Sequence, residues 1–347
     1  MRVLEQGGGR GAGRPVRPPV MADVARLAGV SHQTVSRVIN GASSIRPETR
    51  ERVLEAIRRL GYRPNTAARA LVTRRSATIG VISTEAGLWG PSSVQRSIEQ
   101  AARETGYFVS SVNLGEVTRP GLSAAVDHLL GQSVEGIIMV VAHDEALEVV
   151  RSQEARVPYV VVEGDLSSAA SAVGVDQVRG ARLATRHLLD LGHTEVVHVT
   201  GPLNWAEARA RVDGWARELR AAGLRPDEPV PGDWTAATGY AAGQRIAQRD
   251  DVTAVFAAND SMALGLLRAF AEAGRSVPGD LSVVGFDDIP EAAYLLPPLT
   301  TVHQDFAAVG RRAIDVLHAA ISGEREDLPR LVEPRLVVRS STGPVRG

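Results

Sequence analysis

The 347-residue chain contains neither cysteine nor lysine, so all 39 of its basic residues are arginines. Without cysteine there are no disulfides, thiolate nucleophiles or thiolate metal ligands. Without lysine there is no Schiff-base lysine and no phosphate-binding lysine of a Walker loop or a kinase. The GxSxG and HExxH patterns are also missing, and the spacing of His193 and His198 favours structural histidines over a metal site. We therefore expect no catalytic residues, no metal site and no cofactor, and a protein that is not an enzyme.

Long hydrophobic runs are missing as well. The longest apolar runs, such as residues 136–142, have the length of a strand. The first 17 residues are rich in Gly, Arg and Pro and lack the continuous apolar segment of a secretory signal. We expect residues 1–17 to be a disordered leader, or the result of a start site assigned too early, on a cytoplasmic protein with no membrane segment.

The net charge of −1 hides two oppositely charged parts. Residues 1–75 hold 15 arginines and five acidic residues, a net charge of +10, whereas the rest of the chain carries −11. A basic head on an acidic body is typical of a protein whose smaller part neutralises nucleic-acid phosphates.

Residues 21–40, MADVARLAGVSHQTVSRVIN, predict two short helices around a turn. Apolar residues at helical spacing line one side of the first helix: Ala22, Val24, Ala25 and Leu27. Gly29 supplies a turn position that tolerates positive φ. Ser31 is the expected N-cap of the second helix, with Thr34 at N3.

The second helix has an apolar side, formed by Val35 and Val38, and a polar side. The polar side carries the hydrogen-bonding side chains of His32, Gln33, Thr34, Ser36 and Arg37. Such side chains reach base edges and phosphates when a helix lies in the major groove of DNA. An ordinary helical hairpin is the alternative, but the polar side favours a DNA-reading helix-turn-helix.

A third helix is predicted within residues 45–62, with Pro47 at its first position and Gly61 as its C-terminal stop. The three helices form a headpiece over residues 18–63. In the linker of residues 64–76, Asn65 could cap a short helix that ends at Leu71, too short to be stable without a partner or DNA.

From residue 77 onward, buried strands alternate with amphipathic helices. The predicted strands are residues 78–83, 107–113, 134–142, 157–163, 173–176, 194–201, 252–260 and 281–288. The predicted helices begin near Ser92, Gly121 and Glu145 or span residues 179–191, 205–222, 238–249 and 261–273. Alternating units of this kind predict an α/β core (77–347) of two doubly wound lobes, with a ligand site at the carboxyl ends of the strands. We assign residues of about 77–175 and 304–334 to lobe 1, and about 176–303 and 335–341 to lobe 2.

Six segments carry a resemblance to a known family. They are MADVARLAGVSHQTVSRVIN, YRPNTAARAL, GPLNWAEARARVDGW, GDWTAATGY, ANDSMALG and SVVGFDDIPEAAYLLPPLTTVHQDF. In this order and spacing they resemble the lactose/galactose repressor family of bacterial transcription regulators, its lac branch in particular, from about Pro18 to Ser341. The resemblance implies a dimer that binds a pseudo-palindromic operator, and a sugar-like effector held between two periplasmic-binding-protein-like lobes. It also implies a recognition helix in the major groove and a hinge helix in the minor groove.

The resemblance assigns roles to individual residues of the headpiece and linker. His32, Gln33 and Arg37 match base-reading positions. Phosphate contacts and support fall to Ser31, Thr34, Ser36 and Asn40. The hinge positions that face DNA are Asn65, Ala68 and Leu71, of which Leu71 matches an apolar wedge inserted at a base step.

The effector site follows from chemistry and resemblance together. Arg211 and Asp287 would face one another across lobe 2, as a fork of donors and an acceptor for adjacent sugar hydroxyls. Asn259 ends a strand with a donor and an acceptor, and Gln304 lies where the chain recrosses between lobes. Further positions are the flat rings of Trp234 and Phe306 and, from lobe 1, Thr84, Leu88, Trp89 and Glu163. Taken singly, each polar residue could equally be a salt bridge, a cap or a surface group.

Two departures from the family pattern matter. Glu163 stands where the lac-type pattern has an aspartate, and Trp89 and Trp205 add bulk, so the sugar can differ from a simple galactoside. No heptad-rich helix follows VVRSSTGPVRG, so a homodimer is expected rather than a tetramer.

We therefore expect a DNA-binding repressor that a sugar inducer, a galactoside or related glycoside, releases from its operator. The alternative is a corepressor-type regulator that binds a purine or another small metabolite. A sugar-binding or sugar-processing protein without a DNA role is least favoured, because such a protein would not need a DNA-binding headpiece.

Overall fold

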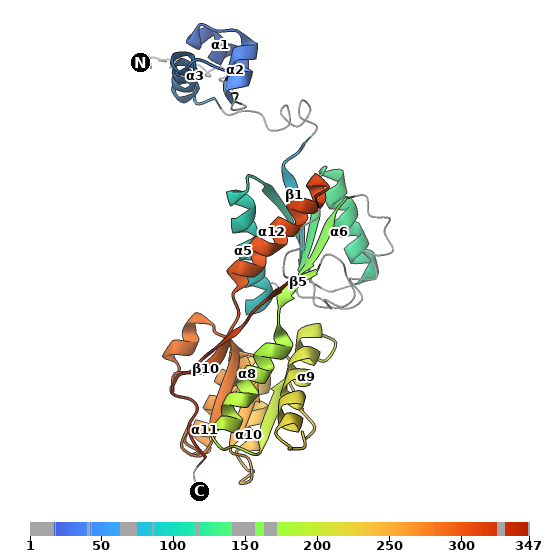
Figure 1. The fold of residues 1–347 in the computed structure, drawn as a ribbon, viewed down its shortest axis with the longest axis vertical. Helices are drawn as coiled ribbons and strands as arrows, with labels where there is room; N and C mark the ends of the chain where they lie inside the picture. Colours follow the sequence, from blue (N-terminus) through green and yellow to red (C-terminus); the bar gives the residue numbers. More distant parts are fainter. Residues whose placement is uncertain are drawn as a thin grey trace, which may run out of the picture. The chain divides into compact units, whose positions relative to one another are not determined.

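The computed structural model describes residues 17, 19–39, 42, 44–62, 75–84, 87–115, 118–140, 157–162, 172–324 and 330–345. The chain divides into two compact units, Met1–Ser76 and Ala77–Gly347 (Figure 1). The predicted helix near Glu145, residues 64–74 of the predicted hinge and residues 1–16 of the predicted leader lie outside the described residues, as do Asn40, Asn65, Ala68, Leu71 and Glu163.

The described residues of the first unit form three helices, α1 (Met21–Ala28), α2 (His32–Ile39) and α3 (Pro47–Leu60). Its local signals act as the sequence predicts. Gly29 and Gly61 end α1 and α3 with φ of 65° and 60°, in the left-handed region that glycine enters at little cost. The side chain of Ser31 caps α2, since its Oγ accepts a hydrogen bond from the backbone N–H of Thr34 at 3.2 Å.

A small apolar core holds the three helices together. Val24 and Ala28 of α1 pack with Val35 and Val38 of α2 and with residues of α3. The predicted apolar side of α1 was wrong at Ala22, which is exposed, and at Leu27, which is 44% exposed. At about 100° per residue, Leu27 lies on the far side of Val24 from Ala28, and Ala28 takes the buried position.

The described residues of the second unit form two six-stranded sheets, one in each lobe. The lobe 1 sheet consists of β1 (Thr78–Thr84), β2 (Phe108–Leu114), β3 (Ile137–Val140), β4 (Tyr159–Val162), β5 (Ala172–Val175) and β11 (Leu331–Val332), in the order β11-β5-β4-β3-β1-β2. The lobe 2 sheet consists of β6 (Val196–Thr200), β7 (Val230–Pro231), β8 (Ala254–Ala257), β9 (Ser282–Asp287), β10 (Thr300–His303) and β12 (Arg335–Val337), in the order β12-β10-β9-β8-β6-β7. Within these sheets every described pair is parallel except β10 with β12.

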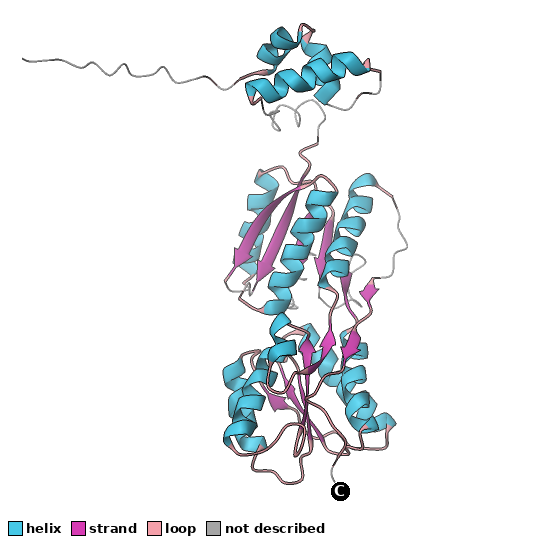
Figure 2. Cartoon of the chain, turned by 90° about the vertical axis from the view of Figure 1, so that its left-hand side faces the viewer, coloured by secondary structure: helices cyan, strands magenta, loops and turns pink. Residues whose placement is uncertain are grey.

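Helices cover both faces of the lobe 1 sheet (Figures 1 and 2). Helices α5 (Trp89–Glu104) and α12 (Phe306–Ser322) share one apolar core with the sheet, and α6 (Arg119–Gly131) packs in a second core on the other face. The two helices on the first face approach so closely that a Cβ on Gly310 would lie 2.5 Å from the backbone of Ser97.

Lobe 2 repeats this layering. Helices α10 (Ala236–Ile246) and α11 (Asp260–Glu272) pack on one face, and α8 (Gln177–Asp190) and α9 (Ala206–Ala221) pack on the other. A short 3₁₀ helix, η1 (Pro290–Tyr294), follows β9. The two doubly wound lobes confirm the predicted fold class. The helix α12 and the short strands β7, β10, β11 and β12 were not predicted.

The chain crosses between the lobes at three places: from β5 to α8, from β10 to α12, and from β11 to β12. Gln177 begins α8 at the first crossing, and Gln304 lies between β10 and α12 at the second. Ligand sites of parallel sheets lie just beyond the carboxyl ends of the strands, and the lobe 2 strands end beside these crossings.

Candidate functional site

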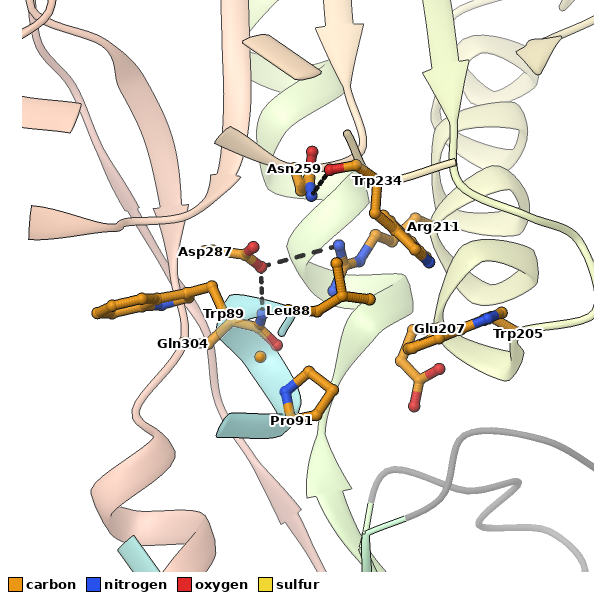
Figure 3. Close-up of a pocket in the computed structure, with 11 residues that line it drawn as sticks. Leu88, Trp89, Pro91, Trp205, Glu207, Arg211, Trp234, Asn259, Asp287 and Gln304 are labelled. Carbon is orange, nitrogen blue, oxygen red and sulfur yellow. Dashed lines mark hydrogen bonds and ion pairs between the residues drawn. The ribbon is translucent and has the colours of Figure 1, made fainter. Parts of the chain in front are cut away.

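A pocket lies where the two lobes meet and contains about 390 Å³ of space, including its open mouth (Figure 3). Lobe 1 contributes the start of α5, and lobe 2 contributes α9 and the segments that follow its strands. The lining residues are Leu88, Trp89, Gly90, Pro91, Trp205, Glu207, Arg211, Trp234, Asn259, Asp287 and Gln304.

Arg211 is a buried cation at the base of this pocket, with 5% of its surface exposed. Its Nε donates to Oε1 of Gln177 at 2.9 Å, and its Nη1 donates to the carbonyl oxygen of Ala258. The guanidinium carbon lies 3.9 Å from the ring centroid of Phe286 and 5.4 Å from that of Trp234, so two aromatic faces help to hold the charge in place. The orientation of the guanidinium is therefore set before any ligand binds.

Asp287 is the buried carboxylate that faces Arg211. Its Oδ1 lies 3.9 Å from Arg211 Nη1, which is an ion pair without a direct hydrogen bond, and accepts a hydrogen bond from Nε2 of Gln304 at 2.7 Å. Burial raises the pKa of Asp287 to about 6, although the charge of Arg211 and the hydrogen bond from Gln304 both lower it. The carboxylate is thus mostly ionised at neutral pH and can accept a ligand hydroxyl.

A strained turn positions this carboxylate. Asp287 and Asp288 have φ of 112° and 56°, a region that costs a non-glycine residue about 1–3 kcal/mol. Asp288 is held by His303 Nδ1 at 2.9 Å and by Arg339 Nη2 at 2.7 Å. Beyond the turn, the backbone N–H of Ile289 donates to Asp260 at 2.9 Å. The surrounding hydrogen bonds maintain a conformation that the two aspartates would not adopt alone.

Trp234 and Trp205 lie on the Arg211 side of the polar pair, whereas the ring of Trp89 points away from the pair (Figure 3). Trp234 is 6% exposed, and its ring centroid lies 5.6 Å from that of Trp205 in an edge-to-face arrangement. It lies flat against Gly201, where a Cβ would come within 2.2 Å of the indole. The buried indole N–H groups of Trp234 and Trp89 have no hydrogen-bond partner among the described residues. Indole faces and N–H donors suit the C–H faces and oxygens of a sugar ring.

Asn259 has a structural function within the same wall. Its Oδ1 accepts a hydrogen bond from the backbone N–H of Met262 at 2.8 Å and caps α11, while its Nδ2 donates to the carbonyl oxygen of Trp234 at 3.0 Å. The bond to Trp234 is visible in Figure 3. Asn259 therefore holds Trp234 in place and still borders the pocket.

A second candidate surface lies on α2. The side chains of Ser31, His32, Gln33 and Arg37 are exposed, and those of Thr34 and Ser36 are half-buried. Because Val35 and Val38 are buried on the opposite side, these polar groups form one outward face. Such a face can contact bases and phosphates in the major groove.

Both parts of the chain match known protein families. Residues 20–65 match the model for bacterial regulatory proteins of the lacI family, and residues 185–342 match a periplasmic binding protein-like domain. The lactose operon repressor of Escherichia coli (strain K12) is 36% identical over 332 residues, which cover 94% of this chain and 91% of that protein.

The chain belongs to the lacI family. It is a DNA-binding transcription repressor with a ligand-binding core.

Two further relatives in the family are the regulators CelR and PurR. The HTH-type transcriptional regulator CelR of Thermobifida fusca is 38% identical over 94% of this chain and 98% of its own length. The HTH-type transcriptional repressor PurR of Vibrio vulnificus (strain CMCP6) is 34% identical over 92% of this chain and 97% of its own length.

Two solved structures resemble this lacI-family fold over nearly the whole chain. The lac repressor dimer bound to operator and the anti-inducer ONPF superposes with a TM-score of 0.84, 34% identity and coverage of 94% of this chain and 100% of that chain. The CelR–cellobiose complex superposes with a TM-score of 0.69, 34% identity and coverage of 93% and 99%.

Most of the predicted effector residues lie together in the structure. Seven line the pocket: Leu88, Trp89, Arg211, Trp234, Asn259, Asp287 and Gln304. Two do not. Thr84 is 3% exposed at the end of β1, and Phe306 is 8% exposed and packs in the core between α5, α12 and the lobe 1 sheet. Glu163 lies outside the described residues.

Sequence reasoning missed several residues at the site. Gly90, Pro91 and the buried Glu207 line the pocket, and Trp205 was noted only for its bulk. Gln177 contacts two of the pocket residues from behind. Its position immediately after the strand predicted at residues 173–176 was the one available signal, because this architecture collects ligand-site residues at strand ends.

The described residues contain no group of three or more metal-binding side chains. In the same part of the chain, no helix has both the length and the hydropathy needed to cross a membrane.

Proposed function

We propose that this repressor is a homodimer that binds a two-fold operator and is released from it by a sugar, a galactoside or related glycoside, bound between the lobes. The headpiece would comprise residues 18–63, the hinge 64–76 and the core 77–347. The observation that carries the proposal is the Arg211–Asp287 pair, held 3.9 Å apart within a pocket that tryptophans border.

The chemistry of this pair matches that of adjacent sugar hydroxyls. A hydroxyl both donates and accepts, so neighbouring hydroxyls can donate to Asp287 and accept from Arg211 at the same time. Oδ2 of Asp287 takes no hydrogen bond from the described residues, which leaves it available to a ligand. Two of the relatives support the same class of ligand, since one is named for the lactose operon and another was solved with cellobiose, whereas a third carries the name PurR.

Exposed apolar side chains support the homodimer. In lobe 2, Leu296 is 90% exposed, Tyr294 is 85% exposed and Leu264 is 44% exposed; in lobe 1, Phe108 is 58% exposed on the edge strand β2. Large apolar groups left in water favour association with a second surface. A two-fold dimer would present two headpieces to two half-sites of an operator.

DNA contact is proposed for the outward face of α2 and for three hinge residues. On α2 and just beyond it, Arg37, His32 and Gln33 would read bases, while Ser31, Thr34, Ser36 and Asn40 would contact phosphates or support the helix. Asn65, Ala68 and Leu71 remain sequence-based predictions because they lie outside the described residues.

Release from DNA requires that the sugar prefer one arrangement of the lobes. A ligand that binds both arrangements equally shifts nothing, however tightly it binds. In the proposed switch the sugar favours the arrangement that separates the two hinge segments. The loss of operator affinity can be no larger than the ligand's preference for that arrangement.

Intrinsic fluorescence offers a direct test of the pocket. Three of the four tryptophans line it, and the fourth, Trp215, is buried elsewhere and donates its indole N–H to Val196 at 3.1 Å. We expect lactose or cellobiose to change the emission in a saturable way, and Trp215→Phe to keep that change. A response to guanine and to no sugar would favour the corepressor function instead.

A further inference from the structure

Four buried side chains form a continuous hydrogen-bonded chain at the base of the pocket. Arg211 Nε donates to Gln177 Oε1 at 2.9 Å, and Gln177 Nε2 donates to Gln304 Oε1 at 2.8 Å. Gln304 Nε2 then donates to Asp287 Oδ1 at 2.7 Å. Each of the four residues is at most 8% exposed, so water does not readily replace any of these bonds.

The two ends of this chain determine its direction. A guanidinium can only donate hydrogen bonds, and an ionised carboxylate can only accept them. The amide oxygen of Gln177 must therefore face Arg211, its nitrogen must face Gln304, and the nitrogen of Gln304 must face Asp287. A glutamine is well suited to the first link, because it presents an acceptor and a donor from one planar group.

Gln177 is not among the residues that line the pocket, whereas Arg211, Gln304 and Asp287 are. It begins α8 just after the chain leaves lobe 1, and Gln304 lies where the chain returns to lobe 1. Their hydrogen bond consequently joins two of the three crossings between the lobes. Any rotation of the lobes that separates these crossings must break or redirect the chain.

We propose that Gln177 is a positioning residue that sets the direction of this hydrogen-bonded chain and couples the effector-holding side chains to the inter-lobe crossings. Its importance for ligand binding rests on the proposed effector site, but its coupling to Asp287 does not. The coupling is therefore measured first in the protein without ligand.

The test is a pair of substitutions that reverses the chain. In Gln177→Glu the new carboxylate still accepts from Arg211, but Gln304 must turn its nitrogen toward residue 177 and its oxygen toward Asp287, where two acceptors meet. Adding Asp287→Asn supplies a donor to that oxygen and completes the chain in the opposite sense. We expect Gln177→Glu to lower the melting temperature of the full-length protein by about 5 °C or more, since a large core loses a few degrees per kcal/mol. The double variant should regain at least half of that loss.

Two controls separate this coupling from simpler effects. Gln248→Glu changes an exposed glutamine and should leave the melting temperature within about 1 °C of wild type. Gln304→Met cuts the chain in its middle, and in that background the benefit of combining the two substitutions should fall by at least half. The proposal is overturned if the double variant loses as much melting temperature as the two single variants added together. It is also overturned if combining the two substitutions gives the same benefit with Met at position 304, because charge repulsion between residues 177 and 287 would then explain the whole effect.

Ligand affinity provides the second measurement. Gln177→Met keeps the side-chain volume but removes both hydrogen bonds, and we expect the affinity for lactose or cellobiose to fall about tenfold although residue 177 does not line the pocket. Unchanged affinity for a sugar that the wild type binds would overturn the role of Gln177 in binding. Failure of the wild type to bind either sugar would instead contradict the proposed function, while the melting experiment still decides the coupling.

Discussion

Replacing Asp287 with asparagine should produce a repressor that still binds DNA but no longer responds to its sugar. Oδ1 of Asp287 accepts from Gln304 at 2.7 Å, and an asparagine oxygen can keep that bond. The asparagine nitrogen then takes the position of Oδ2 and presents a donor to the ligand. A sugar hydroxyl that donated to the carboxylate there would lose its acceptor.

The size of the effect follows from the burial of the site. Asp287 is 7% exposed, so water cannot fully substitute for the lost partner. A hydrogen bond to a charged group contributes about 1.5–3 kcal/mol, which corresponds to a loss of roughly 10- to 150-fold in sugar affinity. Titrations of tryptophan fluorescence give the sugar affinity, and anisotropy of a labelled DNA site gives the operator affinity with and without sugar.

Asp213→Asn is the matched control for this prediction. Asp213 lies on α9 two residues after Arg211, but it pairs with Arg217 at 2.8 Å and does not line the pocket. We expect this substitution to leave sugar affinity within about twofold of wild type. Sugar affinity that is unchanged in Asp287→Asn, or lowered equally in both variants, would refute the assigned role.

Three further predictions follow from the pocket, the headpiece and the exposed apolar residues. Burial raises the pKa of Asp287 from 3.8 to about 6, so the wild type should lose stability relative to Asp287→Asn as the pH rises through this range. Sugar affinity should increase as the pH rises through about 6, because the carboxylate that accepts the hydroxyl then forms. Melting experiments and fluorescence titrations from about pH 4.5 to 8 measure the two effects. Arg37→Ala should weaken binding to a selected operator by about 1–3 kcal/mol and binding to random DNA much less, and equal losses at matched salt in a gel shift would contradict a base contact. Leu296→Asp should shift the protein from dimer toward monomer in sedimentation at micromolar concentration, because it places a charge on a side chain that is 90% exposed in the single chain, whereas an unchanged dimer would exclude Leu296 from the interface.

Local signals made the headpiece predictable. Gly29 and Ser31 act through their own backbone and the next few residues, so their roles can be inferred from sequence alone. Leu27 was misplaced because a short helix offers two overlapping apolar sides, and only packing against α3 decides between them. The doubly wound lobes were also predictable, because each strand and helix shows its own local pattern of apolar residues and their alternation indicates the fold.

The pocket was predictable where it follows from topology. Asn259, Asp287 and Gln304 each follow or end a parallel strand, and parallel strands bring their carboxyl ends to one edge. The position of Gln177 after a predicted strand was a signal, but its hydrogen-bond partners were not predictable, because they lie 34 and 127 residues away and nothing in its own neighbourhood identifies them. Phe306 was ambiguous, since an aromatic residue at the start of a helix can face a ligand or a core, and it packs in the core of lobe 1.

The effect of sugar on operator affinity tests the central claim most directly. The full-length protein would first select a two-fold DNA site from a random library, and its affinity for that site would then be measured by anisotropy with lactose, cellobiose or guanine present. The account predicts that a sugar lowers the affinity in a saturable way and that guanine leaves it unchanged. Tighter DNA binding with sugar, or a response to guanine alone, would contradict it.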